Sequence, residues 1–188
     1  MGRSAFPLPP TRVALMRRVN FEFKAHLKNE ARLRATLVQL GARRVGTDHQ
    51  VDTYFRVPRG RLKIREGNLE NALIYYRRSN QTRPRRSDVE MVPLAKGNAL
   101  RALLTEWLEP WSVVEKRRQI YFVSNVKIHL DRVKGLGEFV EVEAISHGQD
   151  PQKARRQAAK FRRLLGIAHS GIIGQSYADL VRERSVRP

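Results

Sequence analysis

Apolar and polar positions first alternate regularly over residues 19–27, which read V-N-F-E-F-K-A-H-L. Alternate residues of an extended segment point to opposite faces, so the two phenylalanines share one face, and Glu22 and Lys24 share the other. One apolar and one polar face are typical of a strand that is buried on one side only. The pattern therefore predicts a half-buried strand near the N-terminus.

Seven further runs show a similar pattern and predict strands. Turn residues separate them, and the sequence Pro58, Arg59, Gly60 predicts a hairpin between the runs at 49–57 and 61–66. Successive hairpins favour an antiparallel sheet, and eight strands are enough to close it into a barrel. These predicted strands cover residues 49–57, 61–66, 72–79, 87–92, 112–123, 126–133 and 138–145.

Capping residues and leucines at helical spacing predict four helices. Asn29 is the expected N-cap of a helix that runs to residue 40. Asp150 and Pro151 begin a strongly basic helix that ends at residue 165, before Gly166. The other two predicted helices cover residues 96–108 and 175–184.

The chain shows no internal repeat and no linker long enough to divide it. We therefore predict a single α+β domain over residues 17–184, with an eight-stranded antiparallel β-barrel and flanking helices. Residues 1–16 carry three prolines without periodicity and are interpreted as a flexible tail, and residues 185–188 are interpreted as a short C-terminal tail. The length of 188 residues is ample for one core.

Charge and composition narrow the function. Lys and Arg number 37 against 18 acidic residues, a net charge of +19, which favours a polyanionic partner: nucleic acid, an anionic membrane or a phosphorylated small molecule. The absence of cysteine excludes disulfides and thiolate metal sites. Without an apolar run of about 20 residues or a signal-peptide core, we expect a cytoplasmic protein with no membrane span.

The strands place charge on the face opposite their apolar residues. Such a face usually points to solvent. Here, however, the interspersed helices need the apolar face, so a closed sheet would turn the charged face inward and form a tunnel. The cations on these faces include Lys63, Arg65, Arg78, Lys116, Arg118 and Lys127.

Glu141 and Glu143 are the most informative residues of this set. They lie two apart in G-E-F-V-E-V-E-A and so project from one face of a strand. Two adjacent carboxylates repel each other unless a cation lies between them, and a divalent metal is the natural candidate. Cations at fixed spacing nearby suit the oxygens of a polyphosphate that such a metal would bridge.

These segments together resemble the CYTH superfamily, the triphosphate tunnel enzymes, and are most similar to its class IV adenylyl cyclase-like branch. The resemblance covers roughly residues 17–182. Each segment is weak alone, but their order and spacing are specific in combination. They are N-F-E-F-K-A at 20–25, D-T-Y-F-R-V-P-R-G-R-L-K-I-R-E at 52–66, L-I-Y-Y-R-R at 73–78, E-K-R-R-Q-I-Y at 115–121, I-H-L-D-R-V-K-G-L-G-E-F-V-E-V-E-A at 128–144 and S-Y-A-D-L at 176–180.

The resemblance implies a triphosphate tunnel, Mg²⁺ or Mn²⁺, and a triphosphate substrate such as ATP, tripolyphosphate or thiamine triphosphate. By position, the metal ligands would be Glu22, Glu141 and Glu143, and Lys24 and Asp131 would support catalysis. The phosphate-binding residues would be Lys63, Arg65, Arg78, Lys116, Arg118 and Lys127.

One position departs from the family signature: Asn20 stands where its first glutamate is expected. An amide offers a carbonyl oxygen but no charge, which leaves the number and identity of the metals open. His129 is interpreted as a residue of the tunnel wall or the surface rather than a ligand, because no second histidine lies at ligand spacing.

Two enzymatic activities fit this pattern. A cyclase converts ATP to cyclic AMP and pyrophosphate, and a triphosphatase hydrolyses an inorganic or organic triphosphate; the sequence does not separate them. The alternative is a nucleic-acid or polyphosphate-binding module without catalysis, supported by the net charge and the basic helix at 150–165. A monomer and a homodimer are both compatible with the sequence.

Overall fold

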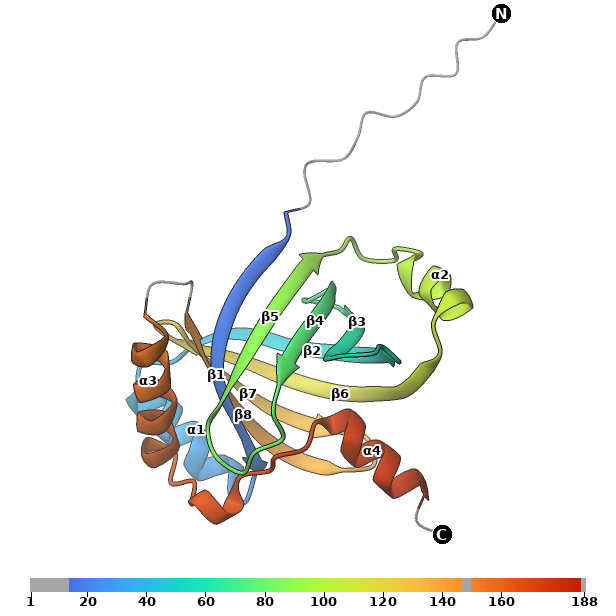
Figure 1. Cartoon of the computed structure of the whole chain (residues 1–188). Coiled ribbons are helices and arrows are strands. Elements are labelled where there is room, and N and C mark those ends of the chain that lie inside the picture. Colours follow the sequence, from blue (N-terminus) through green and yellow to red (C-terminus); the bar gives the residue numbers. More distant parts are fainter. Residues whose placement is uncertain (1–13, 147–149, 187–188) are drawn as a thin grey trace, which may run out of the picture.

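The computed structural model describes residues 14–146 and 150–186, and within them eight strands form a closed antiparallel barrel (Figure 1). The order around the barrel is β1-β5-β4-β3-β2-β6-β7-β8, so the first and last strands pair and close it. The predicted fold class is thereby confirmed. The strands are β1 (Met16–His26), β2 (Arg43–Phe55), β3 (Arg61–Gly67), β4 (Ala72–Arg78), β5 (Arg85–Pro93), β6 (Pro110–Val123), β7 (Val126–Val133) and β8 (Gly137–Ser146).

Helices cover one outer side of the barrel and one of its ends. Helices α1 (Glu30–Gln39) and α3 (Pro151–Leu164) lie on the side formed by β1, β7 and β8 (Figure 1). Helix α2 (Leu100–Trp107) connects β5 to β6, and a short 3₁₀ turn, η1 (His169–Gly171), leads to α4 (Tyr177–Val186). None of the helices described is long and apolar enough to cross a bilayer.

The alternation on the strands decides which side chains face inward. Phe21, Phe23 and Ala25 of β1 point outward and pack with Leu33 of α1 and Phe161 of α3 in one apolar cluster. Since this cluster occupies the outer surface of the sheet, the charged residues between them on β1 project into the barrel. The packing of α1 and α3 outside the barrel and the polar interior therefore both follow from the alternation of side chains on the strands.

Most predicted boundaries agree with the structure, and Asn29 and Asp150 cap α1 and α3 as expected. The largest difference is β2, which begins at Arg43 rather than at residue 49. Residues 43–48 lack strand alternation and contain Gly46 at a shift in register, but pairing with β6 supplies their backbone hydrogen bonds. Helix α2 also starts later than predicted, after a turn at Gly97 whose φ is +73°.

The two ends of the barrel differ. The end near Lys24, Arg61 and Ser112 is closed by α4: Ser112 donates to the Ala178 carbonyl at 3.3 Å, and Arg61 pairs with Asp179 at 2.9 Å. At the opposite end, where β1 and β7 begin, lies a cavity of about 330 Å³. Residues 1–13 of the predicted tail at 1–16 lie outside the described residues.

Candidate active site

The barrel interior is a polar lumen of about 80 Å³. Its wall includes residues from β1, β2, β3, β4, β5, β6 and β8, and Tyr177 of α4 forms part of its closed end. The lumen brings together Glu22, Lys24, Lys63, Arg65, Arg78, Lys116, Arg118, Glu141 and Glu143, all of which the sequence analysis identified.

A carboxylate that the sequence analysis missed organises the cations of β3 and β6. Asp52 of β2 accepts from Lys63 Nζ at 2.9 Å, from Arg65 Nε at 2.8 Å and from Lys116 Nζ at 2.5 Å. Burial alone would raise the pKa of Asp52, but Arg65, Lys116 and Lys63 lower it well below its usual value. One negative charge thus holds three cations in place.

Lys116 is the least favourably placed of the three cations. Burial lowers its pKa to about 7, and the positive charges of Arg65, Arg118 and Lys63 add to this effect, although Asp52 opposes it. The guanidinium groups of Arg65 and Arg118 cannot release a proton at ordinary pH. Repulsion among these cations is therefore relieved by loss of a proton from Lys116. The lumen therefore contains a cation that can lose its charge near neutral pH.

Arg118 connects this cluster with the carboxylates of β7 and β8. Its Nε and Nη2 bind the two oxygens of Asp131 at 2.7 and 2.6 Å, and Nη2 also lies 2.7 Å from Glu141 Oε2. The hydroxyl of Tyr177 donates to Asp131 Oδ2 at 2.8 Å. Asp131 is thereby held by the barrel and α4 together.

Glu22 of β1 pairs in register with Glu143 of β8, but its carboxylate contacts cations. Arg78 Nη1 is 3.1 Å and Arg85 Nε 3.7 Å from Glu22 Oε1. Burial raises the pKa of Glu22 to about 7, and the charges of Glu141 and Glu143 add to this while Arg78 opposes it. When it is ionised, the Glu22 carboxylate is the counter-ion of Arg78.

Lys24 is held at the closed end of the lumen. Its Nζ donates to the Gln175 carbonyl at 2.6 Å and lies 4.0 Å from the centre of the Tyr177 ring. Burial lowers the pKa of Lys24 to about 8, although Glu141 and Glu22 favour its charged form. The segment before α4 and the ring of Tyr177 thus fix Lys24 at the closed end of the lumen.

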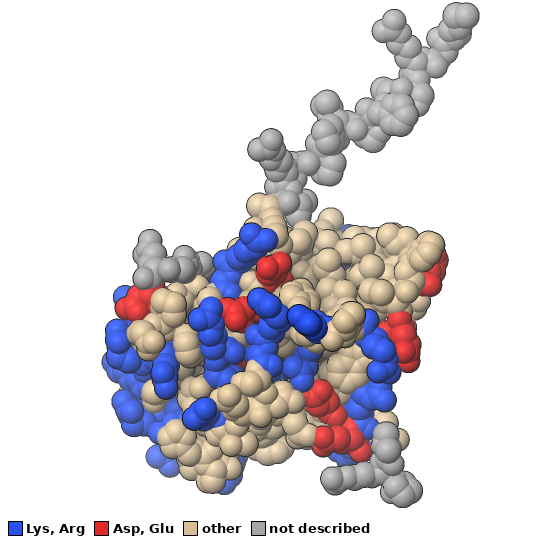
Figure 2. All heavy atoms as spheres, viewed as in Figure 1, with Lys and Arg blue, Asp and Glu red and all other residues tan. Residues whose placement is uncertain are grey.

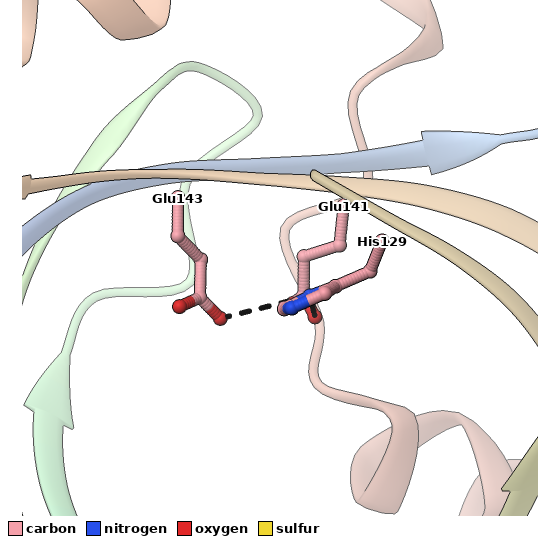
Figure 3. A group of neighbouring side chains, drawn as sticks. All are labelled: His129, Glu141 and Glu143. Carbon is pink, nitrogen blue, oxygen red and sulfur yellow. Dashed lines mark ion pairs between the residues drawn. The ribbon is translucent and has the colours of Figure 1, made fainter. Parts of the chain in front are cut away.

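Glu141 and Glu143 converge on His129, which pairs with Glu141 across β7 and β8 (Figure 3). One donor atom from each of the three residues can be chosen so that all lie within 4.8 Å of one another. His129 Nδ1 is 3.6 Å from Glu141 Oε2 and 3.9 Å from Glu143 Oε1. These separations are too long for hydrogen bonds.

This donor set fits a divalent cation. Oxygen ligands and a neutral imidazole are suitable for Mn²⁺ and related ions, and carboxylates for Mg²⁺. Both nitrogens of the buried His129 and Oδ1 of the buried Asn20 have no hydrogen-bond partner within the described part of the chain. The Asn20 amide nitrogen instead lies 3.3 Å from Glu143 Oε2, within donating distance.

Lys127 lies near the open end, where Glu70 is its partner. Glu70 also accepts from Arg65 Nη1 at 3.0 Å, so it connects β7 to β3. Strand alternation could not identify Glu70, because it lies in the turn between β3 and β4. Asp52 could have been found by extending the alternation from Tyr54, and His129 by alternation within β7.

A family model described as CYTH domain matches residues 19–177. Solved structures with the same fold include the PH1012 protein of Pyrococcus horikoshii OT3, at 24% identity and a TM-score of 0.72, with 86% of this chain and 98% of that one covered. A search of curated protein sequences finds no match.

Two further structures carry functional descriptions. A proposed adenylate cyclase from Vibrio parahaemolyticus is 18% identical, with a TM-score of 0.70 and coverage of 88% of this chain and 98% of that one. HpAC1 from Hippeastrum, described as a proposed adenylyl cyclase with a dominant triphosphatase activity, is 15% identical, with a TM-score of 0.57 and coverage of 91% and 97%. At these identities, the likeness shows the fold.

Proposed function

Because this chain belongs to the CYTH family, we propose that it is a divalent-metal-dependent enzyme acting on a triphosphate-bearing substrate. The reaction is either cyclisation of ATP to cyclic AMP and pyrophosphate or hydrolysis of an inorganic or organic triphosphate. The observation that carries the proposal is one lumen in which buried Lys and Arg side chains surround a convergent pair of glutamates. Cations and a metal site on opposite walls suit a chain of phosphates between them.

The phosphate chain of the substrate would bind the Lys and Arg side chains that pair with internal carboxylates in the free protein. The lumen of about 80 Å³ is much smaller than the 300–1,000 Å³, roughly, of ordinary ligand sites, because ion pairs span it. A triphosphate could replace Asp52 on Lys63 and Lys116, since its oxygens accept the same hydrogen bonds. The substrate would therefore bind to cations whose positions are already set.

The cations have distinct expected roles. Lys63, Arg65, Lys116 and Arg118 would bind phosphate oxygens from one wall, and Arg78 and Lys127 from the neighbouring strands. Lys24 would orient the phosphate at the closed end, and Asp131 would position Arg118. A divalent metal held by Glu141 and Glu143 would neutralise charge that develops on the transferred phosphoryl group.

The substrate would enter from the end opposite α4. The 330 Å³ cavity there shares Arg18, Arg65 and Glu143 with the lumen, so the two spaces adjoin. Arg18 and Lys127 supply positive charge at this entrance. At the closed end, Tyr177 and its contacts with Asp131 and Lys24 occupy the space among the described residues.

We expect the purified protein to turn over at least one of ATP, tripolyphosphate and thiamine triphosphate when Mg²⁺ or Mn²⁺ is present. Product identification separates the activities: cyclic AMP and pyrophosphate indicate cyclisation, and orthophosphate indicates hydrolysis. EDTA should abolish turnover, and restored metal should recover it. The absence of turnover with all three substrates would contradict an enzymatic function.

The charge state of Lys116 should affect substrate capture. We expect kcat/KM to fall as pH rises through about 7, because the free protein loses a phosphate-binding charge. The groups that face Lys116 are Asp52, Lys63, Arg65 and Arg118. Lys116→Arg should remove this fall in kcat/KM from the pH profile, because arginine keeps its charge over this range.

Comparison of the two proteins on one substrate is the control. Ionisation of the substrate affects both profiles equally, so the difference between them reports Lys116. Identical profiles for the wild type and Lys116→Arg would show that Lys116 keeps its charge throughout this range.

A second candidate function rests on the outer surface of α3. The helix contains Lys153, Arg155, Lys160, Arg162 and Arg163 but no acidic residue, and none of these five cations has an ion pair with a described residue. Lys and Arg gather over α3 and the neighbouring α1 in Figure 2. A nucleic-acid-binding module would bind through this face, with an affinity that falls steeply as salt rises and that needs no metal.

A further inference from the structure

The side chain of His129 is buried without a polar partner. It is 0% exposed, and neither ring nitrogen has a hydrogen-bond partner among residues 14–146 and 150–186. A buried polar group without a hydrogen bond costs about 1–3 kcal/mol. The ring nevertheless points toward the oxygens of Glu141 and Glu143 rather than into the apolar layer outside the barrel (Figure 3).

The spacing of the three side chains suits a common ion. Ligand distances of about 2.0–2.2 Å in an octahedral site place neighbouring donors roughly 3 Å apart and opposite donors roughly 4.3 Å apart. The separations from His129 Nδ1, 3.6 Å to Glu141 Oε2 and 3.9 Å to Glu143 Oε1, fall between these limits. Small side-chain movements would bring all three donors to one ion.

Of the other polar groups near this cluster, Asn20 Oδ1 also has no hydrogen-bond partner among the described residues. Glu22 is bound by Arg78, and the amide nitrogen of Asn20 lies within donating distance of Glu143. Arg118 reaches only Oε2 of Glu141, and a carboxylate oxygen can accept from Arg118 and still bind a metal. His129 therefore offers unpartnered ring nitrogens beside the two glutamates.

We propose that His129 is a direct ligand of the metal in this site, together with Glu141 and Glu143, and that its nitrogen makes the site prefer Mn²⁺ to Mg²⁺. The proposal rests on the metal requirement of the proposed function and identifies the metal. Mg²⁺ prefers a shell of oxygens with several waters, whereas transition-metal ions accept an imidazole more readily. A site with one nitrogen and two carboxylates should therefore discriminate between the two ions.

Pulsed electron paramagnetic resonance of Mn²⁺ bound to the full-length protein tests the ligand directly. We expect a ¹⁴N hyperfine coupling of the strength of a bound imidazole, measured with Mn²⁺ alone and with a methylene-bridged triphosphate that contains no nitrogen. The coupling should be lost in His129→Leu, which keeps the bulk of the ring, and in His129→Gln. His49→Gln is the matched control, because His49 is an exposed histidine of β2, and this variant should keep the coupling.

Calorimetric titrations test the preference. We expect Mn²⁺ to bind the wild type at least tenfold more tightly than Mg²⁺, and this ratio to fall toward unity in His129→Gln. Bound Mn²⁺ without ¹⁴N coupling, a coupling that survives in His129→Leu, or no Mn²⁺ bound under either condition would overturn the proposal. Turnover that depends on a metal would leave the proposed function intact in each case, whereas turnover without any metal would contradict that function instead.

Discussion

The double substitution Glu141→Gln and Glu143→Gln should lower the kcat/KM of metal-dependent triphosphate turnover by about 10³-fold or more. Loss of one group that stabilises developing charge already costs about 10²–10³-fold, and here both carboxylates of the proposed metal site lose their charge. The two side chains keep their size, so the barrel should retain its packing. Steady-state kinetics at saturating Mn²⁺ measures the effect.

Glu138→Gln provides a matched control on the same strand. Glu138 points outward from β8 and pairs with Arg132 on the surface, so its substitution should leave kcat/KM within about twofold of the wild type. If the double variant kept the principal activity, the assignment of Glu141 and Glu143 to a metal site would be wrong. Binding of nucleic acid through α3 would then be the favoured function.

Asp52→Asn should destabilise the fold by about 3–5 kcal/mol. The carboxylate is 1% exposed and is the shared partner of Lys63, Arg65 and Lys116, so its neutralisation leaves buried positive charges facing one another. Unfolding by urea, followed by circular dichroism, measures the change in the free energy of unfolding.

Two comparisons assign this loss to the uncompensated charge. Asp88→Asn breaks a surface pair with Arg86 and should cost less than about 1 kcal/mol. Adding Lys116→Met to Asp52→Asn should recover part of the stability, because one of the repelling cations is removed. Stability of Asp52→Asn equal to the wild type would show that the three cations do not need this carboxylate.

Most of the fold follows from local patterns in the sequence. The limits of β7 agree with the alternation to the residue, and β8 differs by one residue at each end. The start of β2 could not be predicted in this way, because residues 43–48 become a strand through hydrogen bonds to β6, which lies far along the chain. Helix α2 is shorter than predicted because Gly97 turns the chain before it begins.

The site was predictable where its residues alternate on strands. Lys63, Arg65, Lys116, Arg118, Glu141 and Glu143 all line the lumen as expected. Glu70 was not, because a turn residue has no fixed facing direction. The partner of Glu22 could not be predicted either. Glu22 lies on β1 and Arg78 on β4, and the two strands are brought together only by their common neighbour β5 in the barrel.

The sequence by itself determined the eight strands and the charge of their inner face, because both follow from the alternation of side chains along an extended backbone. Only the tertiary structure decided which of these charges meet. Closure of the barrel places Asp52 among three cations, and the register of β7 and β8 places His129 opposite Glu141. Spacing along the chain is local, whereas the partners of a buried charge are set by strands that pair across the whole domain.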